Sequence, residues 1–115
     1  HLDMGPWVNE YMYQDALEIT LQEHNITDFT REYHFKTKYH GREIGHAHQA
    51  DFLVRNKVFI ECKAINQLGA EQRQQLWNYM RLTGIRIGIL YNFAPFHDQC
   101  ERCYLDVDQQ VMYAF

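Results

Sequence analysis

The stretch ADFLVRNKVFIECK, residues 50–63, decides the fold of this chain. Two runs rich in β-branched and aromatic residues flank the polar residues 55–57, a separation that predicts a β-hairpin with a short loop. In that register Asp51 lies directly opposite Glu61. Because side chains alternate along a strand, Lys63 shares the face of Glu61. The sequence therefore predicts two carboxylates and one ammonium group at one end of a hairpin.

Two carboxylates directly opposite each other repel, so a cation is expected between Asp51 and Glu61. A hard divalent cation prefers oxygen ligands, and Lys63 beside it could orient or deprotonate a water molecule. The alternative is a surface hairpin whose glutamate and lysine form a solvated ion pair of little energetic worth. The short D-x9-E-x-K pattern alone does not decide between the two, because such patterns recur by chance.

Composition limits the class of protein. The chain has 115 residues, of which 46% are hydrophobic and 15% aromatic, so we expect residues 1–115 to form one domain that folds alone or as a homodimer. Its apolar runs are too short to span a bilayer, so no membrane partner is expected. Three sparse cysteines fit a reducing compartment and predict a cytoplasmic protein. A net charge of −4 excludes nucleic-acid binding by bulk electrostatics alone, so a polyanion would need a local basic patch and a metal.

The order of predicted elements gives the fold class. Helical periodicity covers residues 7–23 and 69–82, and strand patterns cover residues 32–39, 50–54, 58–63 and 85–91. A turn at residues 40–42 leads into the second strand, which continues toward the hairpin. The first three strands are expected to be antiparallel, and the last is expected to run parallel to one of them after a helical crossover. This order predicts an α/β fold with a mixed sheet flanked by helices.

The second predicted helix carries a polar stripe formed by Gln72, Gln75 and Tyr79. Such a stripe is more often a solvent-facing surface than part of a site. Here the crossover returns the helix across the sheet directly after Lys63, so the stripe could border the same site. Glutamine can orient a water molecule or the lysine, and tyrosine can hydrogen-bond to a substrate or stack on it.

Several spaced blocks together resemble a known family. The blocks are Gly5-Pro6 with Glu10 and Tyr13, residues 50–54 (ADFLV), 61–64 (ECKA), 75–79 (QLWNY) and 88–93 (GILYNF). In this order they look like the GxxExxY family of the PD-(D/E)xK nuclease superfamily, in its RecB-like branch, and the resemblance covers nearly the whole chain. It implies a restriction-endonuclease-like α-β-β-β-α-β core.

The resemblance also implies an activity. The superfamily's roles make Asp51, Glu61 and Glu10 the metal ligands for Mg²⁺ or Mn²⁺, and Lys63 the catalytic lysine. Gln75 and Tyr79 match the Gln-x3-Tyr element of the RecB-like branch. The implied protein is a divalent-metal-dependent nuclease that hydrolyses phosphodiester bonds of nucleic acid, with DNA as the expected substrate. The alternative is a non-catalytic nucleic-acid-binding or scaffold protein that retains the nuclease fold.

Two departures from the family pattern stand out. Family members usually carry a further helix before the Gly-Pro element, whereas this chain begins at His1, so the domain is expected to lack that leading N-terminal helix. The position before Ala50 is often basic in the family and is Gln49 here, which weakens one phosphate contact.

Three other groups of residues have alternative explanations. His46 and His48 could bind a transition metal, but an exposed or substrate-facing strand edge is the better interpretation. His97, Cys100 and Cys103 lack a second ligand pair, so a C-terminal loop is expected instead of a zinc site. Basic residues around the three strands are either a solvated surface or a rim that contacts phosphates. They are Lys36, Lys38, Arg42, Arg55 and Lys57.

Overall fold

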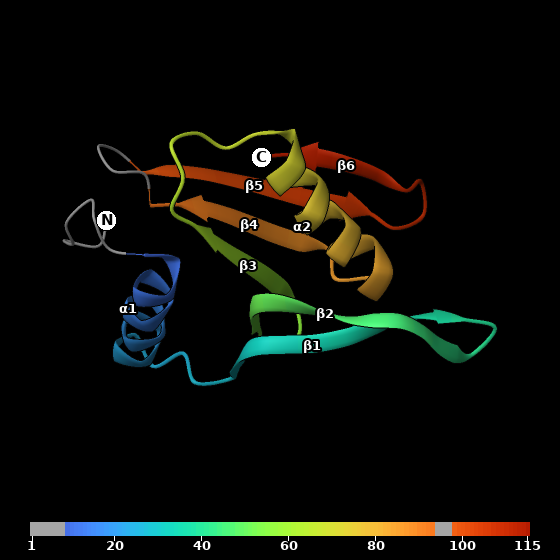
Figure 1. Ribbon diagram of the computed structural model, residues 1–115, viewed down its shortest axis with the longest axis horizontal. Coiled ribbons are helices and arrows are strands. Elements are labelled where there is room, and N and C mark those ends of the chain that lie inside the picture. Colours follow the sequence, from blue (N-terminus) through green and yellow to red (C-terminus); the bar gives the residue numbers. More distant parts are fainter. Residues whose placement is uncertain (1–8, 94–97) are drawn as a thin grey trace.

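The computed structural model describes residues 9–93 and 98–115, which form two helices and a six-stranded sheet (Figure 1). The elements in chain order are α1 (Glu10–Glu23), β1 (Phe29–Tyr39), β2 (Arg42–Val54), β3 (Val58–Lys63), α2 (Ala70–Thr83), β4 (Ile87–Asn92), β5 (Gln99–Asp106) and β6 (Val111–Ala114). The strands lie side by side in this same order. Neighbouring strands are antiparallel except for β3 and β4, which are parallel and joined through α2.

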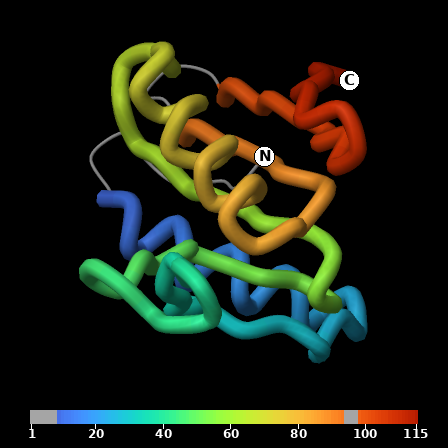
Figure 2. The backbone as a smooth tube through the Cα atoms, turned by 90° about the vertical axis from the view of Figure 1, so that its right-hand side faces the viewer, coloured from blue at the N-terminus to red at the C-terminus, as the bar shows by residue number. Residues whose placement is uncertain are grey.

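Each helix covers one face of the sheet (Figure 2). Leu76 and Met80 of α2 belong to a core cluster with Phe59 and Leu90 of the sheet. On the other face, Tyr13 of α1 packs in a second cluster that Leu17 and Leu21 extend. The predicted α-β-β-β-α-β order, with a parallel final pair in a mixed sheet flanked by helices, is therefore confirmed.

Helix α1 is fixed at its start and along its length. Asn9 caps it, since its side-chain oxygen accepts a hydrogen bond from the Met12 N–H at 3.0 Å. Arg31 of β1 donates to Asp15 and to Glu18, which ties the helix to the sheet. The predicted start of this helix near Trp7 lies outside the described residues.

The hairpin at the centre of the sheet has the predicted register. Val54 pairs with Val58 across a loop of residues 55–57. Arg55 and Asn56 both adopt a left-handed φ of 54°, and the Lys57 N–H donates to the Val54 carbonyl at 3.0 Å. This tight turn matches the twist of the strands, so the register that places Asp51 opposite Glu61 is fixed locally.

Two glycines set the position of α2 over the sheet. Gly84 ends the helix at a φ of 77°, and its N–H donates to the Met80 carbonyl at 2.8 Å. Gly88 lies beneath the helix, where a Cβ atom would come within 2.6 Å of Met80 Sδ and 3.0 Å of Leu76 Cδ2. The helix therefore packs closer to β4 than any larger residue at position 88 would allow.

Two expectations need correction. The first strand begins at Phe29 instead of Glu32, because its pairing with β2 extends to the Phe29–Val54 pair. Cys100 and Cys103 lie in strand β5 instead of a C-terminal loop, because β5 pairs along the whole of β4 and β6 pairs with β5 in turn. His97 lies outside the described residues.

The basic residues around the first three strands do not form one cluster. Lys38 lies near the end of the β1–β2 hairpin, where Tyr39 pairs with Arg42. Lys57 lies at the opposite end, in the β2–β3 turn. Arg55 in that turn pairs with Asp28 at 3.1 Å. The strand direction thus divides the predicted rim into two separate groups.

Candidate active site

Strands β2 and β3 are joined by carboxylates beyond the Phe52–Ile60 pair, the last of their register. The Asp51 N–H donates to Glu61 Oε1 at 2.9 Å, and the Cys62 N–H donates to Asp51 Oδ2 at 2.8 Å. The side chains thus take the place of backbone carbonyl acceptors where the two strands separate. The structure brings Asp51 and Glu61 together, as the hairpin register predicts.

The two carboxyl groups are strongly perturbed. Glu61 is only 3% exposed, and burial, together with the neighbouring charge of Asp51, raises its pKa to about 8. Burial also raises the pKa of Asp51, against the opposing effects of the Cys62 N–H and the Lys63 charge. Each carboxylate accepts a backbone N–H from the opposite strand, so the two acidic groups lie against each other. In the absence of a cation the pair therefore retains a proton near neutral pH.

Glu10 reaches the same place from α1. Its Oε2 accepts a hydrogen bond from the Ala64 N–H, just after β3, at 3.2 Å. Its negative charge contributes to the raised pKa of Asp51. Glu10 therefore faces the end of β3 instead of the outer side of its helix.

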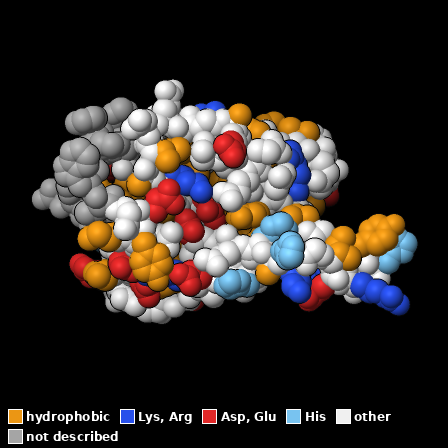
Figure 3. Space-filling model, in the orientation of Figure 1, with side chains coloured by type: hydrophobic (Ala, Val, Ile, Leu, Met, Phe, Trp, Pro, Cys, Tyr) orange, Lys and Arg blue, Asp and Glu red, His pale blue; other side chains and the backbone are white. Residues whose placement is uncertain are grey.

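Lys63 is tied to helix α2. Its Nζ donates to Gln75 Oε1 at 3.2 Å, and Gln75 Nε2 donates to the Tyr79 hydroxyl at 3.2 Å. Burial raises the pKa of Tyr79, and the charge of Glu61 adds to that rise. The polar stripe of α2 thus borders the carboxylate pair and does not face only solvent. Figure 3 shows acidic and basic side chains gathered over the sheet between α1 and α2.

The donor set suits a hard cation. Within residues 9–93 and 98–115, no group of three or more His, Cys, Asp or Glu side chains is arranged to hold a metal ion. Asp51 and Glu61 each use one carboxyl oxygen for a backbone N–H and have a second oxygen, and oxygen ligands are what Mg²⁺ and Mn²⁺ prefer. Burial is the main cause of both raised pKa values, and the charges of Asp51 and Glu10 add to the rise at Glu61 and Asp51, respectively. A divalent ion would offset these charges, so the residues present fit such an ion.

One residue at the site was missed from the sequence. Asn92 is fully buried, and its amide binds both the N–H of Ile65 at 3.0 Å and the carbonyl of Ile65 at 2.9 Å. It also donates to Gln99 Oε1 at 2.8 Å. Asn92 thereby fixes the connector that follows Lys63. A polar residue at the end of an apolar strand is the sequence signal that could have identified it.

A groove leads away from this site. It has a volume of about 800 Å³ and runs between α2 and the base of the β1–β2 hairpin. Gln75 and Tyr79 line one side, and Thr37 and His48 line the other. The His48 ring lies 5.7 Å from the Tyr79 ring, so this histidine faces the groove. His46 is exposed on the same strand.

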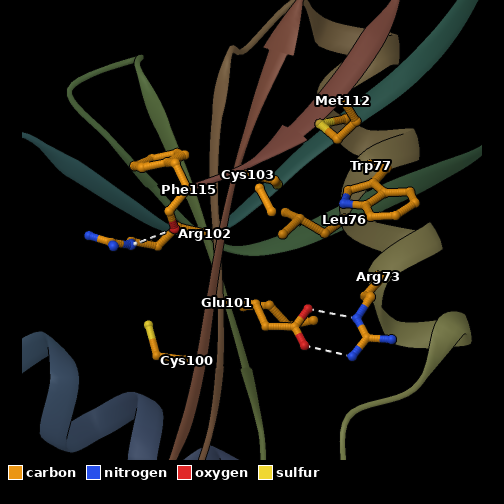
Figure 4. A pocket seen from close by; sticks show the side chains of 11 residues that line it. Arg73, Leu76, Trp77, Cys100, Glu101, Arg102, Cys103, Met112 and Phe115 are labelled. Carbon is orange, nitrogen blue, oxygen red and sulfur yellow. Dashed lines mark hydrogen bonds and ion pairs between the residues drawn. The ribbon is translucent and has the colours of Figure 1, made fainter.

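A second hollow lies on the other side of α2 (Figure 4). It has a volume of about 380 Å³ and a largely apolar lining that includes Leu76, Trp77 and Met112. Two of its three charged residues, Arg73 and Glu101, bind each other through two hydrogen bonds, and the third, Arg102, donates to the Phe115 carbonyl. This hollow contains none of the predicted site residues.

Among the described residues, no helix is long and apolar enough to cross a membrane.

Comparisons with known proteins identify the family and the fold. A family model of the PD-(D/E)XK nuclease superfamily matches residues 1–103. The search of curated proteins finds no match. The crystal structure of SSO0001 is similar to this chain, with a TM-score of 0.63 and 22% sequence identity over 89% of this chain. The chain spans 54% of the length of that protein.

The structural likeness supports the restriction-endonuclease-like core, and the family model covers most of the chain. The chain belongs to the PD-(D/E)XK nuclease superfamily.

Proposed function

We propose that this protein is a divalent-metal-dependent deoxyribonuclease of the GxxExxY family, in the RecB-like branch of the superfamily. One observation carries the proposal: Asp51 and the buried Glu61 lie against each other at the end of a hairpin, each accepting a backbone N–H from the opposite strand, with Lys63 two residues further along. Burying two neighbouring carboxylates is costly in a purely structural role. A bound cation offsets that cost.

Each residue has a role in this proposal. Asp51, Glu61 and Glu10 would hold Mg²⁺ or Mn²⁺. When bound, such an ion neutralises charge on the scissile phosphate and lowers the pKa of a coordinated water. Lys63 donates a hydrogen bond to a phosphate oxygen or to the attacking water, and so stabilises the charge that develops there.

Gln75 and Tyr79 act as positioning residues. Gln75 accepts from the ammonium group of Lys63, and the Tyr79 hydroxyl fixes the Gln75 amide. Without these two hydrogen bonds the Lys63 side chain would sample several rotamers, and misplacing a catalytic group by about 1 Å can cost on the order of a hundredfold in rate.

The three cysteines are free thiols, which supports the expected cytoplasmic location.

A cleavage assay tests the proposal. Purified protein is incubated with single-stranded, duplex and branched DNA, and with RNA, in the presence of Mg²⁺ or Mn²⁺. We expect metal-dependent cleavage of DNA that Lys63→Ala suppresses by at least about a hundredfold, while Lys57→Ala, in the distant β2–β3 turn, retains it. Full cleavage by Lys63→Ala would remove Lys63 from the mechanism.

The non-catalytic alternative has one observation in its favour. Asp51 and Glu61 also close the gap between β2 and β3 through backbone hydrogen bonds, so they contribute to structure without any metal. If the protein binds nucleic acid but cleaves none of these substrates with either metal, the scaffold function is the correct one.

A further inference from the structure

The β1–β2 hairpin extends beyond the rest of the sheet, and we call its outer part, residues 36–47, the hairpin arm (Figure 1). Every residue of the arm is exposed except Thr37, which is half-buried. The arm ends in a tight turn, with a φ of 49° at His40 and 76° at Gly41. A two-stranded ribbon without a core on either face gains little stability from burial, so its sequence is free to serve binding.

The arm differs in charge from the rest of the protein. It contains three basic residues, Lys36, Lys38 and Arg42, and one acidic residue, Glu43, whereas the whole chain has 15 acidic and 11 basic residues. Within the described part of the chain, none of these three cations belongs to an ion pair. Figure 3 shows basic and histidine side chains along this projecting region. The arm is therefore a local basic surface on an acidic protein.

The basic side chains occupy both faces of the ribbon. Tyr39 pairs with Arg42, so these two share one face, and Lys38 points to the other. Each groove of duplex DNA has a phosphate backbone along both walls, whereas a single strand offers only one. The major groove is about 12 Å wide and admits a two-stranded β-ribbon. Cations on both faces therefore favour a duplex.

The groove beside α2 connects the arm to the candidate active site. Thr37 and His48 at the base of the arm line this groove together with Gln75, which binds Lys63. Arg81 of α2 also lines it. A polynucleotide that contacts Lys63 can thus continue along the groove toward the arm.

The length of the arm sets the length of DNA that it can reach. Arg42 lies nine residues before Asp51 on β2. At about 3.3 Å per residue this corresponds to roughly 30 Å, and at about 3.4 Å per base pair it matches roughly eight to nine base pairs. The arm therefore extends on one side of the scissile phosphate.

We propose that the hairpin arm lies along a groove of duplex DNA on one side of the scissile phosphate, with its basic side chains on the phosphates of about eight to nine flanking base pairs. The proposal rests on the proposed function, because it names the substrate of that site. It makes duplex DNA the substrate and makes binding depend on the length of one flank.

A binding experiment without cleavage tests it. Fluorescence anisotropy measures the affinity of each protein for a 5′-labelled duplex of about 30 base pairs in EDTA, over a series of salt concentrations. The arm variant is Lys36→Ala/Lys38→Ala/Arg42→Ala. The control, Arg55→Ala/Lys57→Ala/Arg86→Ala, removes the same charge around the β2–β3 turn and the start of β4.

We expect the arm variant to bind at least about tenfold more weakly and to lower the salt slope by about 2 to 3, while the control keeps the wild-type slope. In a series of shortened duplexes, wild-type affinity should rise until one flank reaches about eight to nine base pairs, and the arm variant should lose that rise. Circular dichroism checks that both variants are folded.

Equal losses in the two variants would overturn the inference, because the effect would then be one of net charge. Equal arm dependence with single-stranded DNA would overturn it as well. Failure of this inference can be distinguished from failure of the proposed function. Cleavage of DNA without any effect of the arm variant rejects only this inference. An effect of the arm variant on binding, in a protein that never cleaves DNA, rejects only the proposed nuclease activity.

Discussion

Two glutamates, Glu61 and Glu101, lie in one row of the sheet, and their pKa values are shifted in opposite directions. Glu61 of β3 pairs with Leu90 of β4, which pairs in turn with Glu101 of β5. Burial and the charge of Asp51 raise the pKa of Glu61 to about 8. The hydrogen bonds from Arg73 lower the pKa of Glu101 instead. A glutamate at the same level of the sheet therefore has a raised pKa on one side of Leu90 and a lowered pKa on the other.

The difference comes from the partner that the fold supplies. Arg73 of α2 reaches Glu101 with two hydrogen bonds of 2.6 and 2.7 Å, so that charge is balanced within the protein. On the other side, the fold places another carboxylate, Asp51, against Glu61. Lys63 is the nearby cation, yet it binds Gln75. A balanced glutamate serves structure, and an unbalanced one suits an external cation.

The cavities next to the two glutamates differ as well. A more enclosed hollow borders Glu101 (Figure 4), whereas a more open groove lies on the side of Glu61. A long polyanion requires an open groove, while an enclosed hollow is typical of small molecules. Cavity shape and electrostatic imbalance therefore indicate the same side of the sheet for the candidate site.

The largest expected effect is on activity. Glu61→Gln removes a charge at the proposed metal site and should lower metal-dependent DNA cleavage by at least about a hundredfold. Glu101→Gln makes the same chemical change in the same row and should change the rate by less than about twofold. Initial cleavage rates at saturating Mg²⁺ measure both. Comparable losses in the two variants would mean that the row acts through stability alone.

The next effect is on the pH dependence of stability. Without metal, folded Glu61 binds its proton more tightly than the unfolded chain does, so stability should fall as pH rises from about 4.5 to about 8. Glu61→Gln mimics the protonated form and should be more stable than wild type at pH 8 to 9, by on the order of a few kcal/mol.

Glu101 should show the opposite sign. Its pKa is lowered on folding, so its contribution is present at neutral pH and is lost as the pH falls below about 4.5. Because the pair with Arg73 is more than a third exposed, the loss should stay within about 1 kcal/mol. Urea unfolding in EDTA from pH 3.5 to 9 compares the two variants. A Glu61→Gln curve parallel to wild type across the upper range contradicts the raised pKa.

A smaller effect tests the helix that separates the two glutamates. Gly88→Ala places a methyl group against Met80, Leu76 and Cys103, and should cost about 1 to 3 kcal/mol of stability. Gly41→Ala is a matched control, because nothing lies within 4 Å of a Cβ atom there and only its positive φ opposes the substitution. Thermal unfolding measures both variants. A larger loss for Gly41→Ala would show that α2 does not pack tightly on β4.

The central hairpin could be predicted because its information is local. A three-residue loop between two β-rich runs fixes the register, and the register fixes which residues oppose each other, so the placement of Asp51 and Glu61 followed from sequence spacing. The Gln75 and Tyr79 stripe followed from helical spacing and the direction of a crossover.

The remaining features depend on contacts between distant residues. The strand at Gln99–Asp106 mixes charged and apolar residues, and pairing with β4 and β6 stabilises it as a strand. The ion pair of Glu101 with Arg73 joins residues 28 positions apart, and Asn92 binds a connector 27 positions away. No local pattern predicts such pairs. The sequence therefore could not show that Glu101 has a cationic partner within the protein and that, in the described part of the chain, Glu61 does not.

The central claim is that the unbalanced pair, Asp51 and Glu61, binds a divalent cation. Electron paramagnetic resonance of Mn²⁺ titrated into the protein measures this directly, because bound Mn²⁺ loses the six-line signal of the free ion. We expect wild type and Glu101→Gln to bind Mn²⁺ with equal affinity, and Asp51→Asn and Glu61→Gln to lose that binding. Equal Mn²⁺ binding by Glu61→Gln, or no binding by wild type, would contradict the account.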